Sequence, residues 1–254
     1  MTAHTAVATA NVLSRLHDAE ARIALLGVLE CRPDLIGLQE WGLSRLRLLR
    51  ETGGVRILPR LTGRPIRLHG PSEYLWLVPP LGGCVVGVRQ ERFELLDARL
   101  RILSPPARAE KIDRLLSLRP PRIAVVGAFR DKESERVVSL ISFHLTAGVQ
   151  LGGLYREDRP MLVARHRLEV RNLNRLVHEE LELGRVVQAA GDSNFDGLRI
   201  DGLTSAWEGR SNQPGTLGPH RQVDDVHGPG PANDVMLLAN ASDHKAVIVR
   251  RVDG

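Results

Sequence analysis

The alternation of apolar and polar positions divides the chain into three blocks, of which the first alternates strands and helices. It predicts a strand in "TAVATANV", a helix from about Leu16 to Cys31, a strand in "DLIGLQ", a short helix in "WGLSRLRLLRETGG" and a strand in "VRIL". Apolar residues recur in the first helix at the spacing of a buried helix face. We expect a Pro to end that helix and the pair Gly53-Gly54 to end the second one. The block therefore reads β-α-β-α-β.

The middle block consists of successive strands. Gly, Pro or charged turns separate the apolar runs "EYLWLV", "GGCVVGVR", "FELLDARLRIL", "PRIAVVGAFR" and "ERVVSLISFHL". One Pro-containing break, "SPPARAEKIDRLLSLRPPR", is expected to be a loop or a short helix.

The last block begins with the longest helix, from about Arg159 to Leu183, followed by the strands "RVVQAAGDSN", "RQVDDV", "DVMLLAN" and "HKAVIVRRV". One face of this helix is expected to carry Leu162, His166, Val170, Leu173, Val177 and Leu181. Arg165, Arg171 and Arg175 should lie elsewhere. The order of elements predicts an α/β protein in which two stacked mixed sheets are flanked by helices. We expect one domain over residues 1–254.

Composition narrows the class of protein. Only 4% of the 254 residues are aromatic, so the core must be built mostly from Leu, Val, Ile and Ala. The net charge of +5 comes almost entirely from Arg and favours a polyanionic partner. A genome rich in G and C would produce the same preference for Arg over Lys, so the charge has modest weight.

Cysteines and the N-terminus indicate the cellular context. Cys31 and Cys84 are too few for a four-ligand zinc site or a disulfide scaffold, and both are expected to be reduced. The start "MTAHTAVATANVL" lacks the basic and apolar regions of a signal peptide, and no stretch has the apolar length of a membrane span. We therefore expect a soluble, cytoplasmic protein, monomeric and without an obligate protein partner.

Polar side chains follow several of the apolar runs directly, which is where catalytic groups usually lie. They are Asn11, Gln39-Glu40, His144, Asp192 with Asn194, and Asp243-His244. In "AAGDSNFD", residues two apart in an extended chain project to the same side, so Asp192 and Asn194 can face one ligand. Gly191 would let that ligand or a neighbouring strand come close. Each signal alone is ordinary, since "GDSN" is typical of a turn; their joint occurrence indicates a site.

In this order, the motifs resemble those of the endonuclease/exonuclease/phosphatase superfamily, which has the deoxyribonuclease-I-like fold, over almost the whole chain. The matching stretches are Asn11, "PDLIGLQE", "SFHL", "GDSN", "GLTSAW" at residues 202 to 207, "RQVDDV" and "SDH". The resemblance implies a four-layered α/β/β/α sandwich with the site at the mouth between the two sheets. It also implies magnesium-dependent hydrolysis of a phosphodiester or phosphomonoester, with Mn²⁺ as a possible substitute.

The resemblance suggests which residues hold the metal ion and the water. Magnesium prefers hard oxygen ligands and keeps several waters, so one or two carboxylates suffice. Glu40 is the expected direct ligand, with Asn11 and Asp243 close by. Asp192 would orient or deprotonate the attacking water, and Asn194 would donate to the water or to a phosphate oxygen.

Two histidines complete the expected site. His244 and Asp224 resemble the family's hydrogen-bonded pair, in which the carboxylate fixes the tautomer and favours the charged imidazole. His144 would donate to a phosphate oxygen or protonate the leaving oxygen. Because Asp225 stands where the family usually has an aromatic residue, either aspartate could be the partner of His244. Asp224 is preferred because it follows the apolar Val223.

Two further departures bear on the substrate. Leu13 stands where abasic-site endonucleases carry an acidic residue, and His144 where they usually have a tyrosine. Both argue against a dedicated abasic-site repair enzyme and leave general nucleases, sphingomyelinase-like enzymes and inositol-phosphate phosphatases. The charge favours a nuclease acting on DNA or RNA, with "RLRLLR", "RHRLEVRNLNR" and the final "RR" along a phosphate backbone. The scarcity of aromatic residues argues against single-strand binding by base stacking.

Three alternatives remain. A lipid, inositol or other small phosphoester could be the substrate, and selectivity would then lie in loops such as 59–73, 103–121, 146–158 and 208–220. A catalytically silent binding module of the same fold is disfavoured because the site residues are all present. A serine or cysteine hydrolase lacks support, because the sequence contains no G-x-S-x-G turn.

Overall fold

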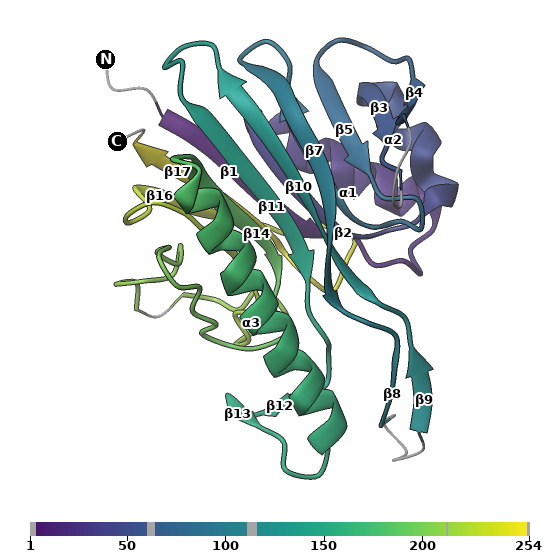
Figure 1. Ribbon diagram of the computed structural model, residues 1–254, viewed down its shortest axis with the longest axis vertical. Coiled ribbons are helices and arrows are strands. Elements are labelled where there is room, and N and C mark those ends of the chain that lie inside the picture. Colours follow the sequence, from purple (N-terminus) through teal and green to yellow (C-terminus); the bar gives the residue numbers. More distant parts are fainter. Residues whose placement is uncertain (1–3, 60–63, 111–115, 212, 253–254) are drawn as a thin grey trace.

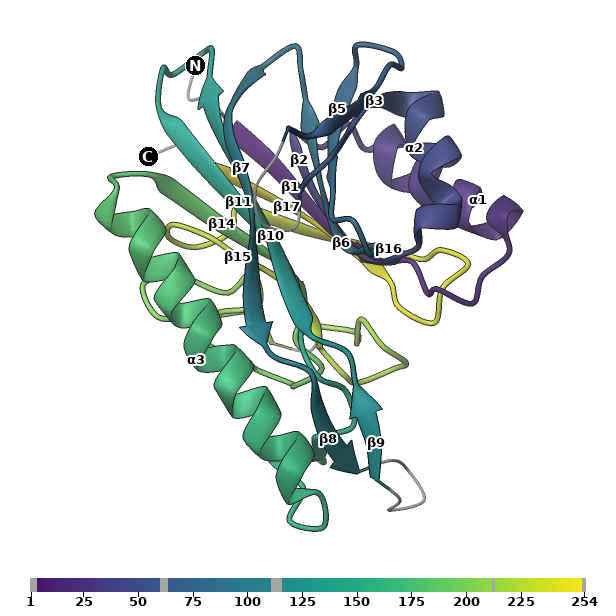
Figure 2. The same ribbon diagram turned by 45° about the vertical axis from the view of Figure 1, so that its right-hand side comes forward.

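Two β-sheets stack face to face, and helices cover both outer surfaces (Figures 1 and 2). The computed structural model describes residues 4–59, 64–110, 116–211 and 213–252. Helices α1 (Asp18–Glu30) and α2 (Leu46–Thr52) lie on the larger sheet, and α3 (Pro160–Glu182) lies on the smaller one. This arrangement confirms the predicted four-layered α/β/β/α sandwich.

The larger sheet has eight strands. In sheet order they are β16 (Asp234–Leu238), β17 (Ala246–Val252), β1 (His4–Asn11), β2 (Leu35–Trp41), β6 (Gly83–Arg89), β5 (Tyr74–Val78), β3 (Gly53–Ile57) and β4 (Ile66–Leu68). Strands β1 and β2 are parallel, and Asn11 pairs with Gln39. Because parallel strands end at the same edge of a sheet, Asn11 and Glu40 lie close together.

The smaller sheet has five strands. In order they are β15 (Asp224–His227), β14 (Val186–Asp192), β11 (Val137–His144), β10 (Arg122–Asp131) and β7 (Phe93–Ser104). Strands β11 and β14 are parallel and place His144 opposite Asp192, while β15 runs antiparallel and places Asp224 opposite Asp192. Three predicted site residues therefore share one edge of this sheet.

Apolar side chains fill all three spaces between the layers. Leu77, Val86, Val125, Phe129 and Val247 belong to the core between the sheets. Separate apolar clusters fill the space under α1 and α2 and the space under α3. No helix within the described ranges combines the length and apolarity needed to cross a membrane.

One prediction about a connecting segment was wrong. The break expected to be a loop or short helix contains an antiparallel pair, β8 (Ala107–Glu110) and β9 (Leu116–Arg119), while residues 111–115 lie outside the described part. Helix α2 ends at Thr52 with Gly53 as its C-cap, as predicted, and the same pair Gly53-Gly54 begins β3. A Cβ at Gly53 would overlap the carbonyl of Tyr74 on β5, so the glycine permits close strand pairing. Two shorter elements, η1 (Leu43–Arg45) and the hairpin β12 (Gln150–Leu151) with β13 (Leu154–Tyr155), occur in connections.

Several arginines of the predicted phosphate-binding runs are buried instead. Arg165 of α3 is 6% exposed, and its guanidinium donates to Glu169 and to the carbonyl of Pro105. Arg251 of the final pair is 2% exposed and donates to the carbonyl of Val226. The pattern of apolar and polar positions cannot distinguish these residues from surface arginines, because a buried cation with internal acceptors has the same sequence pattern.

Buried Arg45 shapes the segment that follows β1. Its guanidinium donates hydrogen bonds to four backbone carbonyls of this segment, those of Val12, Leu13, Ser14 and Leu16. Helix α1 begins only at Asp18, two residues later than predicted, and the Glu20 carboxylate accepts the His17 N–H at this start. The loop between Asn11 and α1 is therefore held in one shape.

Gly191 lies on β14 directly against Phe143 of the neighbouring strand β11. A Cβ at this position would overlap the carbonyl oxygen of Phe143 and lie 2.8 Å from the Cγ of its ring. The neighbouring strand, not a ligand, is thus what the glycine accommodates.

We expect Gly191→Ala to lower the free energy of unfolding by about 1–3 kcal/mol, because the added methyl group must displace backbone. The matched control is Gly27→Ala in α1, where a Cβ would make an ordinary 3.5 Å contact with Leu238. That change should be neutral or stabilising by up to about 1 kcal/mol, since Ala favours a helix. Urea unfolding of both variants tests this, and equal stabilities would contradict it.

Candidate active site

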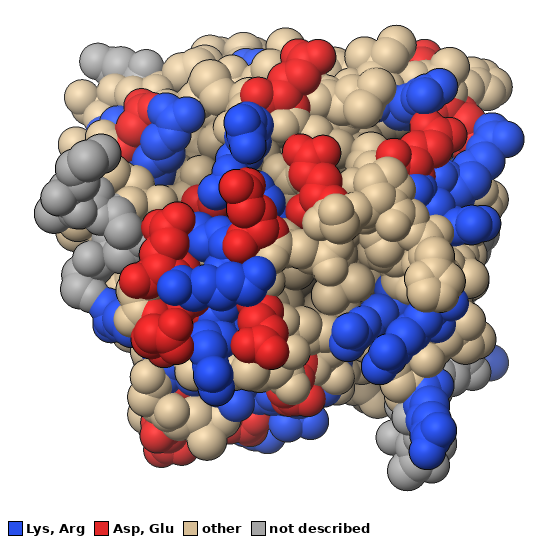
Figure 3. All heavy atoms as spheres, turned by 90° about the horizontal axis from the view of Figure 1, so that it is seen from above, with Lys and Arg blue, Asp and Glu red and all other residues tan. Residues whose placement is uncertain are grey.

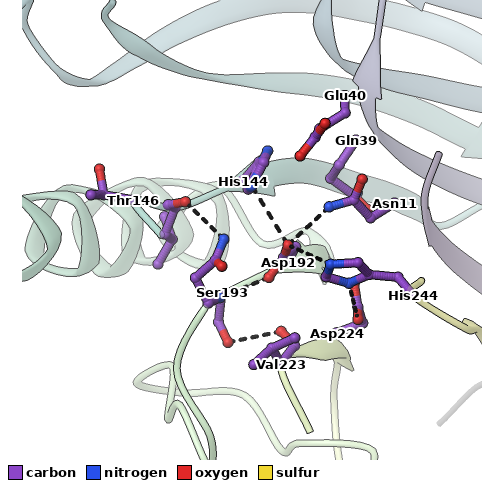
Figure 4. A network of polar contacts seen from close by, with 12 residues as sticks. Asn11, Gln39, Glu40, His144, Thr146, Asp192, Ser193, Val223, Asp224 and His244 are labelled. Atoms are coloured by element: carbon purple, nitrogen blue, oxygen red, sulfur yellow. Dashed lines mark hydrogen bonds and ion pairs between the residues drawn. The ribbon is translucent and has the colours of Figure 1, made fainter. Parts of the chain in front are cut away.

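The centre of the site is the carboxylate of Asp192 at the end of β14, which is 1% exposed (Figure 4). One oxygen, Oδ2, accepts a hydrogen bond of 3.0 Å from the Asn11 amide, which comes from the larger sheet. The other oxygen, Oδ1, accepts one of 2.8 Å from the Asn194 backbone N–H. The carboxylate therefore joins the two sheets at their shared mouth.

A histidine–aspartate pair lies beside this carboxylate. The Nδ1 of His244 is 2.8 Å from Asp224 Oδ2, and its Nε2 is 3.9 Å from Asp192 Oδ2. The pairing is with Asp224, as preferred from the sequence. Asp225 instead accepts hydrogen bonds from the Ser205 hydroxyl and the Ala206 N–H. Successive strand residues point to opposite faces, which explains why only one of the two can reach His244.

His144 lies on the other side of Asp192. Its Nε2 is 3.5 Å from Asp192 Oδ2, and its Nδ1 is 3.4 Å from a guanidinium nitrogen of Arg122. Because a guanidinium can only donate, Nδ1 of His144 is the acceptor in that contact. The ring proton is therefore on Nε2, directed toward Asp192.

Glu40 reaches the site through an irregularity in β2. The pairing of β2 with β6 shifts register between Leu38 and Trp41, and Glu40 has a φ of +57°. Bulges re-aim side chains next to active sites, and non-glycine residues at positive φ are uncommon outside such places. The Glu40 carboxylate accepts hydrogen bonds of 3.0 Å from the N–H and hydroxyl of Ser14, and Figure 4 shows it above Asp192.

Asn194 departs from the arrangement predicted for an extended chain. The strand ends at Asp192, and Asn194 has a φ of +53°, so the two-residue alternation does not extend to it. Its side-chain amide donates to the carbonyl of Leu145, and only its backbone N–H contacts Asp192. The side chain thus anchors the loop to the end of β11.

Asp243 lies at the rim. Its side chain is 49% exposed, with Oδ1 3.9 Å from His244 Nε2 and Oδ2 3.6 Å from Arg15. All eight residues singled out in the sequence are therefore at one end of the sandwich, and Asp192, Glu40 and Asp243 share one mouth.

The surroundings shift the pKa values of Asp192, His244 and His144 in different directions from their ordinary values. Burial and the charge of Asp224 raise the pKa of Asp192 to about 7, against the opposing effect of His244. Burial acts to lower the pKa of His244, but the hydrogen bond and charge of Asp224 outweigh it and raise this pKa to about 9. Burial, with the charges of Arg122 and His244, holds the pKa of His144 well below its usual range. Near neutral pH, His244 is charged and His144 is neutral.

Sequence reasoning missed Arg122, which lines a cavity of about 210 Å³ beside His144. Leu81, Cys84 and Ile123 are among its other walls. No motif marks this arginine. The register of the β10–β11 hairpin could have revealed it. The two strands run antiparallel with Val125 opposite Ser142, so Arg122 at the start of β10 lies near His144 at the end of β11.

Comparisons with known proteins agree on the fold. No protein-family model and no curated protein sequence matches the chain. Among solved structures, the human Nocturnin catalytic domain with bound sulfate has a TM-score of 0.64 at 19% identity, covering 97% of this chain and 93% of that one. Danio rerio TDP2 complexed with a single-strand DNA product has a TM-score of 0.63 at 14% identity, covering 97% and 98%. A Bacteroides thetaiotaomicron mannosyl-6-phosphatase has a TM-score of 0.61 at 16% identity, covering 96% and 98%.

Similar matches include proteins described only as endonuclease/exonuclease/phosphatase family members from Bacteroides species. The likeness covers 96–98% of this chain in each of these comparisons, so it includes both sheets. The chain therefore has the deoxyribonuclease-I-like fold of the endonuclease/exonuclease/phosphatase superfamily.

Proposed function

We propose that this chain is a divalent-metal-dependent phosphodiesterase that hydrolyses nucleic acid. The observation that carries the proposal is the buried carboxylate of Asp192, held by Asn11 and the Asn194 N–H beside the His244–Asp224 pair. A phosphodiester repels an attacking anion, so hydrolysis needs both a group that takes a proton from water and positive charge near the phosphate oxygens. This cluster offers both within one buried space.

Each residue has a role that follows from its contacts. Asp192 orients a water and takes up its proton, since its pKa of about 7 lies near the working pH. The imidazolium of His244 stabilises negative charge that develops on the phosphoryl oxygens, and Asp224 keeps it charged and oriented. Neutral His144 donates through Nε2, which suits a hydrogen bond to a phosphate oxygen better than proton delivery to the leaving group.

The residues fit a hard divalent cation such as Mg²⁺ or Mn²⁺. The buried Asn11 Oδ1 has no hydrogen-bond partner within the described part of the chain, and the carboxylates of Glu40 and Asp243 lie at the same mouth. Oxygen donors of this kind are what Mg²⁺ prefers. When bound there, the ion would neutralise phosphate oxygens and acidify a bound water.

Ligand atoms of Asp192, Asp224 and His244 also lie within 4.8 Å of one another. The imidazole of this group donates to Asp224 and carries a positive charge, so it would repel a cation. We therefore assign the ion to Glu40, Asn11 and Asp243.

Support for nucleic acid as the substrate comes from charge and from structural likeness. The chain carries a net charge of +5, which favours a polyanion. One of the similar structures, the Danio rerio TDP2 complex, holds a single-strand DNA product. The likeness to a mannosyl-6-phosphatase favours a small phosphoester as the second candidate.

We expect Asp192→Asn to reduce Mg²⁺-dependent turnover by about 10²–10⁴-fold, because the group that takes up the proton is lost. The assay compares plasmid, single-stranded DNA, RNA, bis(4-nitrophenyl) phosphate and phosphomonoesters, and Asp201→Asn, an exposed carboxylate outside the site, serves as the control. Unchanged turnover in the Asp192 variant would refute the assigned role. Intact DNA and RNA beside rapid hydrolysis of a phosphomonoester would favour the second candidate.

The positive charge of His244 can be tested by replacing, one at a time, the neighbouring aspartates Asp224 and Asp225. In metal-free protein, NMR titration should give His244 a pKa well above 6.5, and Asp224→Asn should lower it while Asp225→Asn leaves it in place. A raised pKa stabilises the fold below the unfolded value near 6.5, and this contribution is lost as the pH rises through about 9. The stability difference between wild type and Asp224→Asn should therefore shrink over that window. A His244 pKa that responds equally to both variants would contradict the pairing.

The role of Glu40 can be measured without turnover. Mg²⁺ that binds only the folded protein raises the melting temperature, and Glu40→Gln should reduce this rise because a charged oxygen ligand is lost. Glu51→Gln is the control, since that carboxylate is paired with Arg22 on the helical face. An equal Mg²⁺-induced rise in wild type and Glu40→Gln would remove Glu40 from the ion site.

A further inference from the structure

Positive charge is concentrated in one segment away from the site, at residues 53–72. This stretch contains four arginines, no lysine and neither Asp nor Glu, so it accounts for four of the five net positive charges of the chain. Strands β3 and β4 form its described core, and they make one edge of the larger sheet. The remainder of the chain is nearly neutral.

Two of these arginines face each other directly. Arg56 on β3 and Arg67 on β4 are register partners, and Cβ atoms of such partners lie about 4.5–5.5 Å apart. Neither forms a hydrogen bond or ion pair with any described residue, and Arg64 nearby is likewise exposed and unpaired there. Burial, with the charge of Arg67, lowers the pKa of Arg56. Like charges in directly opposite positions destabilise a sheet, so this pair costs stability and receives no compensation within the described chain.

The pair lies on the same face of the sheet as the active site. Arg56 is opposite Leu77 of β5, and Leu77 belongs to the core between the sheets. Its neighbour Val55 belongs instead to the cluster under α1 and α2. Because side chains alternate along a strand, Arg56 points toward the side on which Asp192 lies.

The smaller sheet covers this edge only in part: Leu58, directly after β3, is still buried in the core between the sheets, whereas Arg67 on β4 is exposed. The main packing contacts between the sheets extend from β17 to β5, and β3 and β4 continue the larger sheet beyond them. In Figure 3, basic and acidic side chains are mixed over much of the visible face. On the lower right, the side on which Figure 1 places β3 and β4, a group of Lys and Arg side chains has no acidic neighbours.

The spacing suits an extended polyanion. Three strand intervals separate β2, which carries Glu40, from β3, or about 14 Å at the usual strand spacing. Through the paired residues Leu77 and Val86, Arg56 is level with Gly37, three residues before Glu40, which adds about 10 Å along the strand direction. Strands β2 and β3 run in the same direction, through β6 and β5. A small phosphoester at Asp192 cannot touch Arg56 and Arg67 at this distance, whereas successive phosphates of a polynucleotide can.

We infer that Arg56 and Arg67 form a docking surface for the phosphate backbone of a polynucleotide, several nucleotides from the phosphate held at Asp192. This inference rests on the proposed function and specifies its substrate as a chain instead of a small phosphoester. The partner is recognised by charge, so the contact is independent of base sequence.

The test is the salt dependence of binding. Wild type and the double variant Arg56→Gln/Arg67→Gln are titrated with labelled single-stranded DNA of 12 nucleotides, without divalent metal so that the DNA stays intact. Loss of two phosphate contacts should reduce the slope of log Kd against log salt by about 1.4, and weaken binding about tenfold or more at low salt. The matched control is Arg130→Gln/Arg136→Gln, which removes two exposed arginines at the end of the β10–β11 hairpin away from His144.

An unchanged slope, or an equal loss in both double variants, would overturn the inference. So would a loss of binding to phosphatidylserine vesicles with DNA binding retained, since the surface would then serve a lipid. Circular dichroism and urea unfolding of each variant exclude loss of fold as the cause. Because the readout is binding, its failure leaves the proposed hydrolysis open, and absence of hydrolysis would leave a positive binding result intact.

Discussion

The site depends on the burial of one carboxylate between two sheets. Removing a carboxylate from water costs several kcal/mol unless hydrogen bonds and opposite charge replace the lost hydration. Around Asp192 these come from separate elements: the Asn11 amide of β1, the Asn194 N–H, and the imidazoles of His144 and His244. Such a carboxylate is tolerated only when both sheets are stacked in this register, so the fold and the site specify each other.

A buried polar network behind the site supports that register. Thr9 donates to the side-chain oxygen of Gln39, whose amide is 3.4 Å from the Ser142 hydroxyl of the opposite sheet. Ser142 in turn donates to the carbonyl of Leu38. A sideways slip of one sheet would leave these groups buried without partners, at about 1–3 kcal/mol each. The network therefore resists the very displacement that would separate Asn11 from Asp192.

The sequence was sufficient for the sandwich and for the position of the motif residues, because strand ends are marked by abrupt changes from apolar to polar. It also favoured Asp224 over Asp225, because Asp224 follows the apolar Val223. The structure adds the reason that only one of the two can face the site, since side chains alternate along the strand. It did not indicate which arginines matter. Buried Arg45 and Arg165, active-site Arg122 and exposed Arg67 all sit among apolar neighbours in the sequence, and only tertiary contacts distinguish them. The left-handed backbone of Glu40 and Asn194 was likewise invisible, because neither residue requires it.

The unequal widths of the two sheets have a consequence for the substrate. Where five strands cover eight, the inner face of the larger sheet is enclosed over its middle and less covered at the β3–β4 edge. The enclosed part is apolar apart from polar groups that are hydrogen-bonded to one another, whereas the edge carries Arg56 and Arg67 in opposition. Folding does not require two cations at these opposed positions of β3 and β4, because two neutral polar side chains would be solvated there without repelling each other. A ligand with regularly spaced negative charge supplies the missing compensation, and the site at Asp192 provides the reason for such a ligand to lie along this face.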